Sequence, residues 1–201
     1  MTLQDELVAE QQLIEEAKVN PEQFGVLYER YVDKIYSYVF HRINNAEVAQ
    51  DIVAQTFFKV LEHLPRFQWK GYSISSWIYK IATNEIYQFY RNEKKVQIVD
   101  ITEVAHLIAE KKDPHQFAAL AEQEECVSEF LKKLPQRQQE VLVLRFIEGL
   151  SNQDIARVFE RNEGAVRQLI FRALANLRKL IVKKENNSDR IINKIRAIFS
   201  F

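Results

Sequence analysis

The stretch LSNQDIARVFERNEGAVRQLIFRALANLRKL, residues 150–180, contains the pattern that decides the fold. Ser151 and Asp154 have the spacing of a capping box, in which a serine side chain caps the first turn of a helix. The apolar side of this helix consists of Ile155, Ala156, Val158 and Phe159. A short break at residues 161–163 precedes a second helix that opens at Gly164. The sequence therefore predicts two helices joined by a tight turn.

The second helix is predicted to be amphipathic. Its apolar residues recur at steps of three and four and form one narrow stripe: Val166, Ile170, Ala173, Leu177 and Leu180. The other side carries Arg167, Gln168, Phe171 and Arg172, followed by Arg178 and Lys179. An ordinary solvated surface mixes both charge signs and avoids a large aromatic side chain. This surface is therefore predicted to meet an anionic partner with flat, apolar edges.

Two short helices with such an outer surface have the geometry that reads the major groove of DNA. Arg can form two hydrogen bonds with guanine, Gln can do the same with adenine, and a phenyl ring can contact thymine methyl groups. Free amides at a helix N-terminus suit a phosphate. The predicted duplex-binding residues are Arg167, Gln168, Phe171, Arg172 and Gly164. Arg178 and Lys179 are assigned to phosphate or solvent, and a helical hairpin with a merely solvated basic surface is the competing interpretation.

Composition argues against a secreted protein held together by disulfides. The 201 residues can form one large or two small domains, and 47% hydrophobic residues suffice for a packed core. The N-terminus lacks the basic start and apolar run of a secretion signal, and the single Cys126 fits a reducing cytoplasm. With only 4 Gly, 4 Pro and few strand-like alternations, the chain is expected to be almost entirely helical and cytoplasmic.

No enzyme motif is visible. The histidines have no metal-ligand spacing among themselves or with Cys126, and the chain has no Gly-rich phosphate loop and no nucleophile motif. We therefore expect no catalytic residue, no metal, no cofactor and no small-molecule substrate. The zero net charge hides a polarity along the chain: residues 1–22 hold six acids against one lysine, and residues 161–184 hold seven bases against one glutamate. The C-terminal part is expected to attract polyanions.

The chain divides into five predicted segments. An acidic N-terminal segment (1–20) precedes a first helical domain (21–95), a linker (96–118), a second helical domain (119–184) and an amphipathic tail (185–201). In the first domain a helix ends at Pro65, the loop RFQWKGYSIS follows, and Ser75 or Ser76 is expected to cap the next helix. The tail could pack on the second domain, contact a protein partner or touch a membrane surface.

The helix after that loop has a second candidate surface. Lys80, Asn84, Tyr87 and Arg91 are spaced four, three and four residues apart and so share one side, whereas Ile78, Ile81, Ala82 and Phe89 are expected to face inward. Basic groups that hold phosphates, beside an aromatic ring that can stack on an unpaired base, suit single-stranded nucleic acid. In the loop, Trp69 is a candidate for base contact, whereas Trp77 is interpreted as a core residue.

Both domains resemble parts of one known family. The segment LKKLPQRQQEVLVLRFIEGLSNQDIARVFERNEGAVRQLIFRALANLRKL resembles region 4 of bacterial sigma factors, and LYERYVDKIYSYVF, AQDIVAQTFFKVL and SSWIYKIATNEIYQFYR resemble region 2. With only a linker between them, the chain is similar to the extracytoplasmic-function (ECF) sigma factors of the sigma-70 family. The resemblance implies an all-α protein of two small helical domains, a region 2 bundle and a region 4 helix-turn-helix, joined by a flexible linker.

The resemblance also implies a function and partners. Such proteins are non-catalytic; they bind core RNA polymerase through its beta-prime clamp helices and beta flap, recognise the −35 and −10 promoter elements, and help to open the downstream one. A possible anti-sigma factor is a further implied partner. The competing function is a helix-turn-helix transcriptional regulator that binds DNA as a dimer without core polymerase. Such regulators usually carry a sensing domain with alternating strands and helices, which this chain does not suggest.

Site residues follow from the same resemblance. The loop and the next helix correspond to the family's downstream (−10) site, where a base flipped out of the duplex enters a pocket. That site is expected to contain Trp69, Lys70, Gly71, Lys80, Asn84, Tyr87 and Arg91. DIVAQTFF resembles the polymerase-binding helix, which implies contacts from Asp51, Gln55, Phe57 and Phe58. The family more commonly has Gln where this chain has Ala54 and an acid where it has Gln55, and Phe57 could equally be a core residue.

Overall fold

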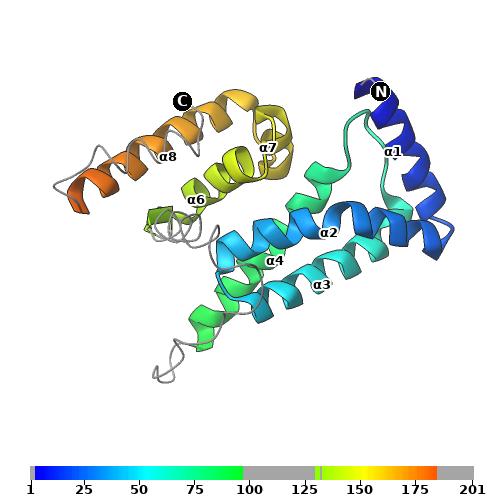
Figure 1. The fold of residues 1–201 in the computed structure, drawn as a ribbon, viewed down its shortest axis with the longest axis horizontal. Coiled ribbons are helices and arrows are strands. Elements are labelled where there is room, and N and C mark those ends of the chain that lie inside the picture. Colours follow the sequence, from blue (N-terminus) through cyan, green and yellow to red (C-terminus); the bar gives the residue numbers. More distant parts are fainter. Residues whose placement is uncertain (1–2, 97–129, 132, 185–201) are drawn as a thin grey trace, which may run out of the picture. The chain divides into compact units, whose positions relative to one another are not determined.

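A computed structural model of the protein describes residues 3–96, 130–131 and 133–184 (Figure 1). Every regular element among these residues is a helix. The chain divides into two compact units, the first built from helices α1 to α4 and the second around α6, η2, α7 and α8. The expected all-α, two-domain architecture is confirmed. Within the described residues, no helix is both long and apolar enough to cross a bilayer.

The first unit is a helical bundle. It contains α1 (Leu3–Ala17), α2 (Pro21–Ile43), α3 (Ala46–His63), the short 3-10 helix η1 (Leu64–Arg66) and α4 (Ser75–Val96). Helices α2, α3 and α4 pack against one another, and α1 lies on α2 (Figure 1). The apolar stripes of these helices meet in a core whose largest fully buried side chains include Leu27, Ile35, Tyr38, Ile78, Tyr79 and Ile86.

Asparagines set the ends of α2 and α3. The Asn20 side chain accepts a hydrogen bond from the Glu22 amide, and Pro21 occupies the first turn of α2, where its missing N–H costs nothing. Asn44 ends α2 in the left-handed conformation, with a φ of 55°, and Asn45 then caps α3 by accepting from the Val48 amide at 3.1 Å. The chain thus reverses direction within two residues, so that α3 packs back onto α2.

The N-terminal segment is part of this bundle. Residues Leu3–Ala17 form α1, which buries Leu13, Ile14 and Ala17. Because α1 packs against α2, the boundary expected at residue 21 does not separate an acidic segment from the first domain. Four of the five acids of α1 lie on its exposed side, whereas Glu10 is buried, and this acidic composition concealed the short apolar stripe.

The start of α4 differs in one detail from the expectation. The sequence predicts a cap at Ser75 or Ser76, but both serines lie inside the first turn of the helix. The hydroxyl of Ser73 accepts from the Ser75 amide at 3.1 Å, and the Ile74 amide donates to the Glu10 carboxylate at 3.2 Å. The first turn of α4 is therefore capped partly by a side chain from α1.

The second unit is built around a helix-turn-helix. It contains α6 (Gln136–Leu142), which continues into one turn of π-helix, η2 (Val143–Ile147), followed by α7 (Asn152–Phe159) and α8 (Glu163–Lys184). Helix α8 packs along α6 (Figure 1). Between the two helices the Asn176 side chain donates to Gln138 at 2.9 Å. The core includes Val141, Leu142, Leu144, Ile155, Val166 and Leu177. The predicted linker beyond residue 96 and the predicted tail (185–201) lie outside the described residues.

Candidate nucleic-acid interface

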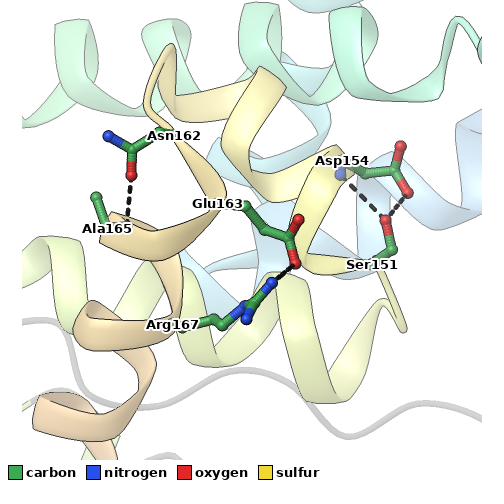
Figure 2. Close-up of polar contacts among 6 residues, drawn as sticks. All are labelled: Ser151, Asp154, Asn162, Glu163, Ala165 and Arg167. Carbon is green, nitrogen blue, oxygen red and sulfur yellow. Dashed lines mark hydrogen bonds and ion pairs between the residues drawn. The ribbon is translucent and has the colours of Figure 1, made fainter.

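Side-chain caps fix the two helices of the helix-turn-helix (Figure 2). The Ser151 hydroxyl accepts from the Asp154 amide at 3.1 Å and donates to the Asp154 carboxylate at 2.5 Å, which confirms the predicted capping pair. The Asn162 side chain accepts from the Ala165 amide at 2.8 Å. Helix α8 therefore begins at Glu163, one residue before the Gly164 start that the sequence suggested.

The apolar stripe of α8 packs against the rest of the second unit. Val166, Ala173 and Leu177 are at most 1% exposed, as the periodicity predicted. Ile170 and Leu180 are only half-buried, and Ile181, which the predicted stripe omitted, is 1% exposed. The stripe therefore drifts around the helix toward its C-terminal end, as expected when a straight helix with 3.6 residues per turn meets a pattern of threes and fours.

The opposite side of α8 is open to solvent. Arg167, Gln168 and Arg172 are exposed, and the Phe171 ring is 76% exposed, which is unusual for a large apolar side chain. Arg178 and Lys179 are exposed farther along the same helix. The predicted duplex-binding residues thus share one accessible surface that begins at the amide-rich N-terminus around Gly164.

An ion pair holds one member of this surface in place. The Arg167 guanidinium donates to the Glu163 carboxylate at 2.5 Å and 3.2 Å, one turn earlier in α8 (Figure 2). Such an exposed pair stabilises a helix only weakly, by roughly 0.3–0.5 kcal/mol. Its more important consequence is geometric, because it directs the guanidinium along the helix toward its N-terminal end.

The loop before α4 is fixed at both of its ends. At its start the Phe67 amide donates to the Leu64 carbonyl at 3.0 Å, and the Phe67 ring lies 4.8 Å from the Trp77 ring, centroid to centroid. At its end Ser73 and Ile74 are bonded to Glu10. Between these anchors Lys70 and Gly71 are exposed and Trp69 is half-buried; Gly71 has a φ of 78°, which favours glycine.

Helix α4 presents the second predicted surface. Asn84 and Arg91 are exposed, and Lys80 and Tyr87 are half-buried. On the inner side Ile78, Ile81 and Ala82 are buried as expected, whereas Phe89 is only half-buried. The sequence analysis did not single out Glu85, whose carboxylate is buried. It forms a 2.6 Å ion pair with Lys59 of α3 and so links α3 to α4.

The polymerase-binding candidates separate into two groups. Asp51 and Gln55 are exposed on α3, and Phe58 is 69% exposed. Phe57 is only 4% exposed, and its ring packs edge-to-face against Tyr28 at 4.7 Å. Phe57 is therefore a core residue, and its prediction as a surface contact for polymerase is wrong. Consecutive side chains of a helix are about 100° apart, so one ring reaches the core while the next stays in solvent.

Sequence reasoning missed the buried polar network beneath the loop. Glu10 is 5% exposed, and its carboxylate accepts hydrogen bonds from the Tyr31 hydroxyl, the Ser73 hydroxyl and the Ile74 amide. Burial and the neighbouring Glu10 carboxylate raise the pKa of the Tyr31 hydroxyl well above its usual range. An acid inside an apolar helical stripe was the only signal available in the sequence. Among the described residues, no group of His, Cys, Asp and Glu could hold a metal ion.

Comparisons with known proteins agree with both modules. The family description "Sigma-70 region 2" matches residues 27–96, and "Sigma-70, region 4" matches residues 124–177. The chain is 32% identical over 158 residues to the RNA polymerase sigma factor YlaC of Bacillus subtilis, covering 78% of this chain and 91% of YlaC. It is 28% identical over 171 residues to the ECF RNA polymerase sigma factor BldN of Streptomyces coelicolor, covering 85% of this chain and 65% of BldN.

Solved structures show the same fold. A structure of CnrH in complex with the cytosolic domain of CnrY matches with a TM-score of 0.64 and 24% identity, covering 88% of this chain and 99% of that one. The sigma factor RpoE of Bartonella quintana, in complex with the anti-sigma factor NepR, matches with a TM-score of 0.62 and 21% identity, covering 82% and 99%. The two region matches and these relatives favour a factor for transcription initiation over a regulator that acts without polymerase. The chain belongs to the sigma-70 family of RNA polymerase sigma factors, in its ECF group.

Proposed function

We propose that this sigma factor binds core RNA polymerase, recognises the two promoter elements with its two units, and promotes transcription initiation. The observation that carries the proposal is that one chain holds two helical units, each exposing a surface suited to a different form of DNA. Helix α8 exposes cations and a phenyl ring beside a helix N-terminus, and the loop before α4 holds the half-buried base-contact candidate Trp69 beside exposed Lys70 and Gly71.

At the upstream element, the exposed surface of α8 enters the major groove. Arg167 and Arg172 can each form a forked pair with guanine, and Gln168 can pair with adenine. Phe171 contacts thymine methyl groups. This contact accounts for a large apolar ring that is 76% exposed in the free protein. The Gly164 amide, next to the Ala165 amide that Asn162 caps, receives a backbone phosphate, and Arg178 and Lys179 hold phosphates farther along the groove.

At the downstream element, the first unit binds a strand that has left the duplex. Extruding a base costs a few kcal/mol, and a shaped pocket offsets that cost. Trp69, Lys70 and Gly71 form the loop side of the pocket, and Asn84 forms the helix side. Lys80, Tyr87 and Arg91 continue along α4 as a track for the phosphates and bases that follow.

Polymerase supplies the catalysis, and the chain itself is non-catalytic and needs no cofactor. The exposed side of α3, with Asp51, Gln55 and Phe58, docks on the beta-prime clamp helices, and the second unit rests on the beta flap. The site of action is the cytoplasm, where polymerase is found. CnrH and RpoE of Bartonella quintana were solved with CnrY and with the anti-sigma factor NepR respectively, so an anti-sigma factor is a partner to test for this chain as well.

Run-off transcription tests the proposal. Core polymerase is assayed with and without the full chain on a library of promoters, and transcript starts are sequenced. We expect new starts downstream of a shared pair of elements. Arg167→Ala and Arg172→Ala should lose preference for the upstream element by about 1–3 kcal/mol per lost pair, whereas Arg178→Ala should weaken all promoters alike. A chain that does not bind core polymerase, or binds without changing start sites, would contradict the proposal.

A further inference from the structure

Glu10 is an unusual residue to find buried. Its side chain lies inside the first unit, and its carboxylate accepts from the Tyr31 hydroxyl on α2, from the Ser73 hydroxyl at 3.1 Å and from the Ile74 amide at 3.2 Å. All three donors are neutral. A carboxylate that is buried against neutral donors depends on every one of its hydrogen bonds, because an unsatisfied buried charge is strongly destabilising. The position of the three donors is therefore tightly coupled to that of Glu10.

The network joins segments that are far apart in the chain. Ser73 and Ile74 lie 63 and 64 residues after Glu10, and the Tyr31 hydroxyl is also 3.3 Å from the Ser73 hydroxyl. Ser73 in turn accepts from the Ser75 amide, which begins α4. The carboxylate thus fixes the last residues of the loop and the first turn of α4 with one group.

What these bonds hold in place is the proposed downstream-element pocket. Trp69, Lys70 and Gly71 lie between the anchor at Phe67 and the anchor at Glu10, and Asn84 lies farther along the helix that Glu10 caps. A pocket for an extruded base must be held to within a fraction of an ångström to discriminate between bases. The loop is held at Phe67 on one side and at Ser73 and Ile74 on the other, so the geometry between these points depends on both anchors.

We propose that Glu10 is a positioning residue for the downstream promoter element, acting through Ser73 and Ile74 on the pocket loop. This makes α1 a part of promoter recognition, although α1 lies before residue 27, where the region 2 match begins. The inference rests on the proposed function of the loop. It adds that the sequence preference at the downstream element is set partly by a residue that never touches DNA.

Two substitutions and one matched control test this assignment in the holoenzyme. Glu10→Gln keeps the size of the side chain but replaces one of its two acceptor oxygens with an NH2 group that cannot accept, so the three hydrogen bonds cannot all persist as they are. Tyr31→Phe removes a single donor and leaves the carboxylate in place. Glu16→Gln removes the same charge from the exposed side of the same helix and should behave as the unchanged protein.

The readout is the ratio of transcription from a promoter with an intact downstream element to that from one with a substituted element. For Glu10→Gln we expect this ratio to fall roughly tenfold, as loss of a charge-assisted buried hydrogen bond implies, and for Tyr31→Phe to fall less. Selectivity at the upstream element and affinity for core polymerase should be unchanged. The double variant should lose little more than Glu10→Gln alone, since both changes act on one network.

Two outcomes would overturn the assignment. One is a Glu10→Gln protein that transcribes both promoters less by the same factor, because a residue that only stabilises the fold would lower the amount of active protein and not its selectivity. The other is an unchanged ratio in a folded variant. Trp69→Ala and Asn84→Ala distinguish failure of the Glu10 assignment from failure of the proposed function. If these two variants also leave the ratio unchanged, the loop is not the downstream site. If they abolish the preference and Glu10→Gln does not, only the role of Glu10 is wrong.

Discussion

At the scale of single residues, the neighbours Phe57 and Phe58 have different roles in α3. Their rings are 4% and 69% exposed, so one belongs to the core and the other to the surface proposed for polymerase. Phe57→Ala should lower the free energy of unfolding by about 3–5 kcal/mol. Phe58→Ala should change it by about 0.5 kcal/mol or less yet weaken binding to core polymerase. Urea unfolding and a competition assay for core polymerase measure the two effects, and equal stability losses in both variants would contradict the assignment.

Tyr31 makes the stability of the first unit sensitive to alkaline pH. Its folded-state pKa is raised by burial and by Glu10, whereas an unfolded tyrosine titrates near pH 10. The folded state therefore keeps a proton that the unfolded state loses, and the stabilisation from this proton is complete below about pH 10. Above that pH the free energy of unfolding should fall by up to about 1.4 kcal/mol per pH unit.

The comparison that isolates this effect is Tyr31→Phe. Urea unfolding of both proteins between about pH 8 and pH 11.5 should give curves that run parallel below pH 10 and converge above it. The other tyrosines contribute equally to both proteins and cancel in the difference. Curves that stay parallel throughout would show that the Tyr31 hydroxyl loses its proton as easily in the folded protein as in the unfolded one.

At the scale of elements, the presentation of α8 depends on its cap. Asn162 accepts from the Ala165 amide at 2.8 Å and lies directly before the surface proposed for DNA. Asn162→Ala should destabilise the second unit by about 1 kcal/mol, whereas Asn162→Asp, an equally good cap, should not. Asn162→Asp adds a negative charge beside the expected phosphate, so it should weaken DNA binding without loss of stability. Thermal unfolding and promoter binding by the holoenzyme distinguish the two; an Asp variant that unfolds as early as the Ala variant would exclude the cap.

Periodicity predicted these elements well because it reports what a single helix buries. The Ser151 cap, the buried Val166, Ala173 and Leu177, and the exposed Arg167 to Arg172 surface all follow from spacing within one segment. The start of α8 was displaced by one residue because Asn162, and not Gly164, supplies the capping group. Local rules define which residues face inward more accurately than where a helix begins.

Contacts between distant segments were beyond such rules. Nothing in the neighbourhood of Glu10 indicates that Tyr31, Ser73 and Ile74 converge on it, because those donors come from other elements. For Phe57 the sequence left two interpretations, a core residue or a polymerase contact, and packing against Tyr28 decides for the core. Whether α1 was a separate segment or part of the bundle also depended on packing, and not on its composition.

At the scale of the whole molecule, the charge of the chain is divided between its ends. The net charge of +0 arises from an acidic stretch at residues 1–22 and a basic one at residues 161–184. Counterion release makes the basic surface a source of salt-dependent affinity for DNA. Each unit alone has only part of the recognition surface, so neither is expected to select a promoter by itself.

Polymerase should convert these two weak contacts into one strong one. Holding both units on one enzyme raises the effective concentration of the second contact, which can increase avidity by about 10²–10⁴ without any new interaction. Fluorescence anisotropy with promoter DNA should therefore give a free chain that binds at about 10⁻⁴ to 10⁻⁶ M with little sequence preference, and a holoenzyme that binds far more tightly. Replacing either promoter element should remove most of the gain, because simultaneous engagement is then lost. Specific promoter binding by the free chain at the affinity of the holoenzyme would show that the units do not depend on polymerase to act together.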